Sequence, residues 1–360
     1  MNMHNIRCES ILGTSHSWAI TMRSILSELK KSGNNLYIKS TNGIDFIDDY
    51  LLEDIDKWHN NPDIDITYTL PQNFRTRFQK NSKVKASVFN YETSKVPQEW
   101  LKELKWVDYI LPSSNWSKQI FIENGWPESK CHVVPLGINP DLKNTKKYTK
   151  LSNKKFKFLN ISIPHYRKNI DLLIEAYYSA FKKEDDVSLV IKTSLQKPKA
   201  IFECNFIEIL KNAQKKFGSN VPQIEVITDN IDNIAELYNA CDAVISTSSS
   251  EGFGLPLLEG LFLEKTVIAP NCTGQLDFLN YNNSILIDVK EVDADSRYQY
   301  WRPSDGSKTY IPNIDSIANS MISAFKESFH FKDNKKEISK NIENTFTWKH
   351  SSERVLNLIK

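Results

Sequence analysis

The sequence lacks the patterns typical of zinc-binding, secreted or membrane-spanning proteins. Its five cysteines are scattered and none forms a C-x-x-C pair, which argues against a zinc site or a disulfide framework. No apolar run approaches the ~18 residues of a membrane-spanning helix, and the first ten residues have no apolar core of a secretory signal. We therefore expect a reducing, cytoplasmic protein. Peripheral contact with the inner face of a membrane stays open.

The sequence also has little net charge, +2 over 360 residues, so no basic field points to nucleic acid. Seven lysines do gather between residues 143 and 157. They could form a nucleic-acid patch, but no aromatic platform is interleaved with them, and a solvated linker is the better interpretation. We place the domain boundary here and predict domains at 1–145 and 146–345, with a final helix at 346–360.

The chain is long enough for two domains, and in both halves short apolar runs alternate with amphipathic stretches. The expected strands are residues 5–13, 35–40, 63–70, 85–92, 108–113, 131–137, 156–163, 187–194, 223–228, 242–247 and 266–270. The expected helices are residues 17–33, 97–106, 115–125, 169–181, 201–218, 233–241 and 255–264. This alternation predicts an α/β protein with two doubly wound parallel sheets, which bind ligands at the carboxyl ends of their strands.

The segment SSSEGFGLPLLEGLF, residues 248–262, places Glu251 and Glu259 eight positions apart around a Gly-Phe-Gly turn. The residues before it predict a buried strand and those after it an apolar helix, so the turn opens a helix. Pro256 suits the first turn of that helix, where its missing N–H costs little. A helix start normally attracts anions, which makes two acids there unexpected.

Gly252 and Gly254 allow the backbone of this turn to approach a ligand closely. The amides expected to face a phosphate are those of Phe253, Gly254 and Leu255. Carboxylates accept hydrogen bonds well from hydroxyl groups. Phosphate-facing amides beside hydroxyl-facing acids indicate a sugar nucleotide. The alternative is structural: one acid at the positive helix end and one on the helix face.

The pattern Glu251-x7-Glu259 within EGFGLPLLE resembles the signature of the retaining glycosyltransferases of the GT-B fold, family four, also called glycosyl transferases group 1. The resemblance covers residues 241–279 and extends to the loop and helix at 165–177. It includes the segments 108–125, 131–139 and 346–359. It implies two Rossmann-like domains that face each other across a cleft, with a C-terminal helix that crosses back to the first domain.

The resemblance also implies roles for individual residues. Glu259 would bind the ribose hydroxyls and Glu251 would face the donor sugar. Lys168, with Arg167, would neutralise the diphosphate leaving group, assisted by the backbone of Gly252, Phe253, Gly254 and Leu255. Taken alone, Arg167 and Lys168 would be interpreted as a solvated pair in a surface loop. Their position between a strand and a helix in this fold favours the diphosphate role. Many family members carry an arginine where this chain has Ser162. Which residue of this chain replaces that arginine at the phosphates stays open.

In this family the first loop of the N-terminal domain lies beside the phosphates and the acceptor. Here Gly13 stands where many members have a glycine pair, and Ser15 and His16 could bind donor or acceptor. Glu92 follows a strand whose end often holds a histidine in the family. It could contact the acceptor hydroxyl or act as base. Mere exposure is an equal alternative for His16 and Glu92, and we name no covalent nucleophile.

Asp293 and Asp295 form a D-x-D triplet, a metal-binding pattern in a different transferase fold, but they lie far past the nucleotide helix. We therefore expect a loop there, with no metal and no resident cofactor. We assign no chemical role to the aromatic stretch 297–310.

The sequence thus predicts transfer of a hexosyl or pentosyl group from a nucleotide-diphosphate sugar to a hydroxyl of a glycan or lipid-linked glycan. The alternatives are a non-catalytic sugar-nucleotide-binding subunit and a phosphorylase or epimerase on a similar scaffold. The oligomeric state stays open.

Overall fold

The computed structural model describes residues 3–195, 197–229, 231, 233–297, 305–326 and 334–359. Its contacts divide the chain into two compact units. The first unit comprises Met1–Tyr91, Lys95–Ile138 and Thr345–Lys360, and the second comprises Glu92–Ser94 and Asn139–Asn344. The change of unit after Ile138 comes seven residues before the boundary expected from the lysine-rich segment.

The first unit is built on a five-stranded parallel sheet in the order β2-β1-β3-β4-β5. Its strands are β1 (Asn5–Ser10), β2 (Asn35–Ser40), β3 (Ile64–Tyr68), β4 (Val84–Val88) and β5 (Tyr109–Leu111). The order reverses between β1 and β3, so the loops after these two strands diverge and leave a ligand position at the carboxyl edge. The loop after β1 contains Gly13, Ser15 and His16.

The helices of the first unit are α1 (Ser17–Lys31), α2 (Asp49–Leu52), α3 (Phe74–Arg77), α4 (Gln98–Glu103), α5 (Asn115–Glu123) and α12 (Trp348–Leu356). Helix α1 ends in two lysines and is followed by Gly33 with φ +84°, a conformation that favours glycine after a helix end. Ser114 caps α5 by accepting from the Ser117 amide.

The strand predicted over 131–137 is wrong. This segment touches the sheet through one bridge, Ile110 to Cys131, with further hydrogen bonds from the amides of His132 and Val134. Pro135 has no N–H, and a ladder cannot continue through it.

The second unit holds a six-stranded parallel sheet in the order β11-β10-β9-β6-β7-β8. Its strands are β6 (Phe156–Ile161), β7 (Val187–Lys192), β8 (Gln223–Ile227), β9 (Ala243–Ile245), β10 (Thr266–Pro270) and β11 (Ile285–Ile287). A separate antiparallel pair joins β12 (Val289–Asp293) to β13 (Lys308–Pro312). The large sheet reverses its order between β6 and β9.

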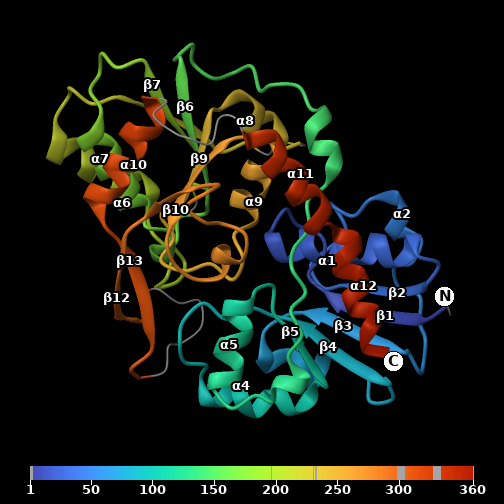
Figure 1. Ribbon diagram of the computed structural model, residues 1–360. Helices are drawn as coiled ribbons and strands as arrows, with labels where there is room; N and C mark the ends of the chain where they lie inside the picture. The colour runs from blue at the N-terminus through green and yellow to red at the C-terminus, as the bar shows by residue number, and fades with distance from the viewer. Residues whose placement is uncertain are drawn as a thin grey trace. The chain divides into compact units, whose positions relative to one another are not determined.

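The helices of the second unit are α6 (Ile170–Ala180), α7 (Phe206–Phe217), α8 (Ala235–Ala240), α9 (Leu255–Phe262), α10 (Ile314–Phe325) and α11 (Lys335–Thr345). Helices α6, α7 and α10 share one hydrophobic core with the sheet (Figure 1). Helix α9 packs on the other face, where a Cβ on Gly260 would lie 3.0 Å from Val244. Both halves are therefore doubly wound, which confirms the predicted fold class.

Helix α12 returns to the first unit and packs against α1. The Ser351 hydroxyl donates to the Pro135 carbonyl at 2.6 Å, and the Ile138 amide donates to the Phe346 carbonyl at 2.9 Å. A Cβ on Gly137 would lie 2.1 Å from the Trp348 nitrogen, so glycine permits this close approach. The predicted C-terminal crossing is confirmed.

The lysine-rich segment belongs to the second unit and is largely exposed. Polar contacts hold it there: the Asn239 amide donates to the Thr145 carbonyl, and Ser152 donates twice to Glu225. Of the helices in the described parts of the chain, none has the length and apolar character needed to cross a membrane.

Candidate active site

The candidate site lies in the second unit, at the carboxyl ends of β6 and β9, where the strand order reverses. The loop after β6 carries Arg167 and Lys168 in a 3-10 turn, Tyr166–Lys168. The loop after β9 carries Glu251 and leads into α9, which lies beside β9 and β10 (Figure 1). Ligands bind at such switch points because the two flanking loops diverge.

Four charged side chains meet here. The Lys168 Nζ lies 2.5 Å from Glu251 Oε1, and Arg167 Nη1 lies 3.3 Å from Glu251 Oε2. Arg167 Nε lies 3.0 Å from Glu92 Oε2. The structure thus brings together the predicted residues Arg167, Lys168, Glu251 and Glu92, all with exposed side-chain fractions of 13–22%.

Partial burial and the neighbouring charges shift the pKa values of these side chains. Burial opposes ionisation of Glu251, but Lys168 and Arg167 outweigh it and lower its pKa to about 2. Burial, and then the neighbouring Arg167, lower the pKa of Lys168. Burial raises the pKa of Glu92, against the opposing effect of Arg167 and with a smaller contribution from Glu251. Arg167 therefore lies between two acids, Glu92 and Glu251.

Several polar residues that the sequence analysis missed hold the two loops together. Asn169 adopts the left-handed conformation with φ 45°, and its amide donates to the Thr247 carbonyl at 2.9 Å and to Ser249 Oγ at 2.8 Å. Arg167 Nη1 donates to Ser248 Oγ at 3.1 Å and also to the Ser250 carbonyl. The available signal was the Thr-Ser-Ser-Ser run before Glu251, which supplies acceptors for the Arg-Lys-Asn turn.

The start of α9 has the expected geometry. Gly254 is its N-cap with φ 95°, a conformation that favours glycine, and Pro256 lies in the first turn. The Gly252 amide donates to Glu92 Oε1 at 3.3 Å. Phe253 and Leu255 have buried side chains, so only their backbone could serve a ligand.

Glu259 lies one turn into α9, where Tyr238 from α8 donates to its Oε2 at 2.7 Å. Burial raises the pKa of Glu259 to about 7, although the Tyr238 bond acts in the opposite direction. Tyr238 was missed because it lies 21 residues earlier in the sequence. Near neutral pH this carboxyl group can lose its proton and then accept a hydrogen bond from a hydroxyl group.

The raised pKa of Glu259 predicts a pH-dependent stability. Between about pH 4.5 and pH 7 the folded state keeps a proton on Glu259 that the unfolded state has lost. The stabilising contribution of this group is therefore complete below about pH 4.5 and is lost as pH rises through about 7. We expect the free energy of unfolding to fall by ~1–2 kcal/mol more in the wild type than in Glu259→Gln between pH 5 and pH 8, after allowing for solvent screening. Urea denaturation across this range measures it. Parallel curves for the two proteins would contradict the assignment.

Three predicted residues lie in the first unit. His16 is exposed and caps α1, its Nδ1 accepting from the Trp18 amide at 3.3 Å. Gly13 has a packing role, because a Cβ there would lie 2.3 Å from the Gly43 carbonyl oxygen. Ser15 is exposed. Their contacts with donor or acceptor remain predictions.

Two further sequence features have structural explanations. Ser162, at the place of the family's arginine, donates to Asn160 Oδ1 at 2.6 Å, and Asn160 donates to the Ile245 carbonyl of β9. In the D-x-D triplet, Asp293 lies in β12 rather than in a loop and pairs with Lys308. Asp295 pairs with Arg297. Residues 298–304 of the aromatic stretch lie outside the described residues.

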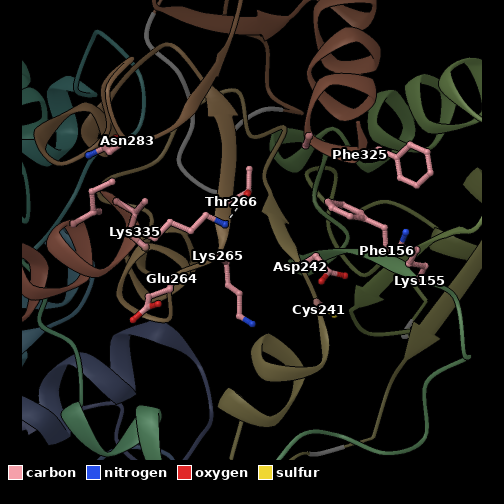
Figure 2. Close-up of a pocket in the computed structure, with 13 residues that line it drawn as sticks. Lys155, Phe156, Cys241, Asp242, Glu264, Lys265, Thr266, Asn283, Phe325 and Lys335 are labelled. Carbon is pink, nitrogen blue, oxygen red and sulfur yellow. Dashed lines mark hydrogen bonds between the residues drawn. The ribbon is translucent and has the colours of Figure 1, made fainter. Parts of the chain in front are cut away.

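A pocket of about 370 Å³ lies at the amino ends of the same strands (Figure 2), and none of the four charged residues of the candidate site lines it. Lys155, Lys265 and Lys335 line it, and Lys335 donates to Thr266 Oγ1 at 3.1 Å. Helices α8, α9 and α10 all end beside this pocket, and lysines stabilise helix C-termini. The lysines therefore lie where their charge can stabilise these helix ends.

Known structures share this architecture. A glycosyltransferase from Rickettsia africae superimposes with a TM-score of 0.71 over 100% of this chain and 98% of its own, at 18% identity. Anabaena Alr3699/HepE in complex with UDP-glucose gives 0.68 over 99% of both chains, at 14% identity. At these identities the likeness concerns the fold, which is that of GT-B glycosyltransferases.

Sequence similarity to known proteins covers part of the chain. Residues 142–298 match the family model described as glycosyl transferases group 1. Human alpha-1,3/1,6-mannosyltransferase ALG2 is 26% identical over 205 residues, 52% of this chain and 48% of its own length. The capsular polysaccharide biosynthesis glycosyltransferase CapM of Staphylococcus aureus is 28% identical over 180 residues, 47% of this chain and 45% of its own. The alignments thus span about half of each relative.

Proposed function

We propose that this protein is a retaining glycosyltransferase of family four, which transfers a sugar from a nucleoside-diphosphate sugar to a hydroxyl of a glycan or lipid-linked glycan. The observation that carries the proposal is the convergence of Arg167, Lys168 and Glu251 before the α9 helix start, within the group 1 domain. The names of the relatives, a mannosyltransferase and a capsular glycosyltransferase, support the reaction class. The UDP-glucose complex of a protein with the same fold supports the donor class.

In this mechanism Lys168 and Arg167 stabilise the charge that develops on the diphosphate as the bond from the sugar's anomeric carbon to the phosphate oxygen breaks. Glu251 accepts hydrogen bonds from sugar hydroxyls and Glu259 from the ribose. The acceptor oxygen attacks the same face that the diphosphate leaves. The leaving phosphate, or Glu92, takes its proton.

A lipid-linked acceptor would place the reaction at the inner face of a membrane, and we expect a cytoplasmic protein with peripheral membrane contact. His16, Ser15 and the backbone of Gly13 are the residues of the first unit that we assign to the phosphates or the acceptor.

The test is a product analysis with the full chain, UDP-, GDP- and ADP-sugars, and oligosaccharide or polyprenyl-linked acceptors. Nuclear magnetic resonance follows nucleotide release and the configuration of the new bond. We expect turnover with one donor and retention of configuration. Binding without turnover would support a non-catalytic subunit instead, and inversion would refute the retaining mechanism.

The proposal assigns the neutralising role to Arg167 and Lys168, so no metal ion is required of the donor site. We expect turnover to stay within about twofold after dialysis against EDTA. A loss of turnover that Mg²⁺ or Mn²⁺ restores would show that a metal shares this role.

A further inference from the structure

We propose that Glu92 acts as a stand-in for a donor phosphate: its carboxylate takes the Arg167 and Gly252 contacts that a phosphate group of the donor would use, and the donor must displace it. This inference rests on the proposed function, because it takes Arg167 and the Gly252 amide as diphosphate ligands. It adds an autoinhibitory contact that regulates entry to the donor site.

The contacts of Glu92 are those of a bound anion. One carboxylate oxygen, Oε2, faces Arg167 Nε at 3.0 Å, and the other, Oε1, accepts from the Gly252 amide at 3.3 Å. A cationic side chain and a backbone amide before a helix start are also the donors that hold phosphate groups in proteins. Carboxylate and phosphate oxygens cannot both take them.

The charge balance of the cluster supports displacement. Arg167 and Lys168 carry two positive charges, and Glu92 and Glu251 carry two negative ones, so the site is formally neutral. A diphosphate that enters a partly buried site loses hydration, which costs free energy. If the site has no net positive charge, electrostatic attraction does not offset this cost. Withdrawal of the Glu92 carboxylate gives the site a net positive charge.

The backbone around Glu92 is fixed independently of its side chain. The Glu92 carbonyl accepts from Ser250 Oγ at 2.5 Å, and Thr93 Oγ1 accepts from Ser307 Oγ at 2.9 Å. Ser94 exchanges two hydrogen bonds with Lys308, at 2.8 and 3.2 Å. Side-chain rotation alone can therefore free Arg167 and Gly252, and the carboxylate stays next to the donor, where it can contact the acceptor hydroxyl.

The test is calorimetric titration of the full chain with UDP, GDP and ADP. If the carboxylate covers these ligands in about 90% of donor-free molecules, the apparent dissociation constant is about tenfold weaker than the intrinsic one. Glu92→Gln should therefore bind the preferred nucleoside diphosphate about five- to tenfold more tightly than the wild type, and Glu92→Ala should change in the same direction. The matched control is Glu184→Gln, an exposed loop glutamate of the same unit, which should leave affinity unchanged.

Equal or weaker binding in both Glu92 variants would overturn the inference, since Glu92 would then position Arg167 for the donor rather than compete with it. If the folded wild type and the variants bind none of the three nucleotides, the proposed function fails and the inference fails with it. Tighter binding in the variants together with lower turnover would support both the competition and the contact with the acceptor.

Discussion

Replacing Lys168 by alanine is expected to lower turnover about a hundredfold or more. The Lys168 ammonium lies 2.5 Å from Glu251 Oε1, and in the reaction it would meet the charge that grows on the leaving diphosphate. An interaction that is stronger in the transition state than in the complex with bound donor raises turnover and has little effect on donor binding. Arg167 stays beside Glu251 at 3.3 Å, so the acid is not left without a cation.

Single-turnover release of the nucleoside diphosphate measures this effect, with Lys199→Ala, an exposed lysine of the same unit, as the control. Turnover should fall while the dissociation constant of the nucleotide changes much less. If turnover is kept and only the Michaelis constant rises, Lys168 is a ground-state contact and the leaving-group assignment is wrong.

The second large effect concerns stability. Gly137→Val is expected to lower the free energy of unfolding by ~3 kcal/mol, at the upper end for an overpacked site. The first added carbon would already lie 2.1 Å from the Trp348 nitrogen, and backbone atoms cannot rotate away as a side chain can. Helix α12 or the segment before it must move.

Urea denaturation, together with limited proteolysis of residues 345–359, tests this prediction, and Lys349→Ala, at an exposed position of α12, is the control. The control should resemble the wild type. A Gly137→Val protein as stable and as protease-resistant as the wild type would contradict the packing described for α12.

The alternation of strands and helices, and the position of the Glu251 turn between β9 and α9, could be predicted from sequence because these patterns are local. The two doubly wound sheets then follow from the parallel topology. Arg167, Lys168 and Glu251 follow predicted strands, and the carboxyl-edge rule predicts that they lie at one edge of the sheet.

Other features depend on contacts between distant residues. The Tyr238 bond to Glu259 and the Glu92 pair with Arg167 join positions 21 and 75 residues apart, and no periodicity records them. The segment 131–137 resembles a strand in composition, but the missing N–H of Pro135 decides against a ladder. The lysine-rich segment has the composition of a linker, and its hydrogen bonds to Asn239 and Glu225 attach it to the second unit.

A crystal structure with the preferred nucleoside diphosphate bound tests the central claim most directly, namely that the residues after β6 and β9 form the donor site. We predict the diphosphate within hydrogen-bond distance of Arg167 and Lys168, the ribose hydroxyls on Glu259, and the Glu92 carboxylate turned away from Arg167. A nucleotide bound elsewhere, such as in the pocket at the amino ends of the strands, with the contacts among Glu92, Arg167, Lys168 and Glu251 unchanged, would contradict the account.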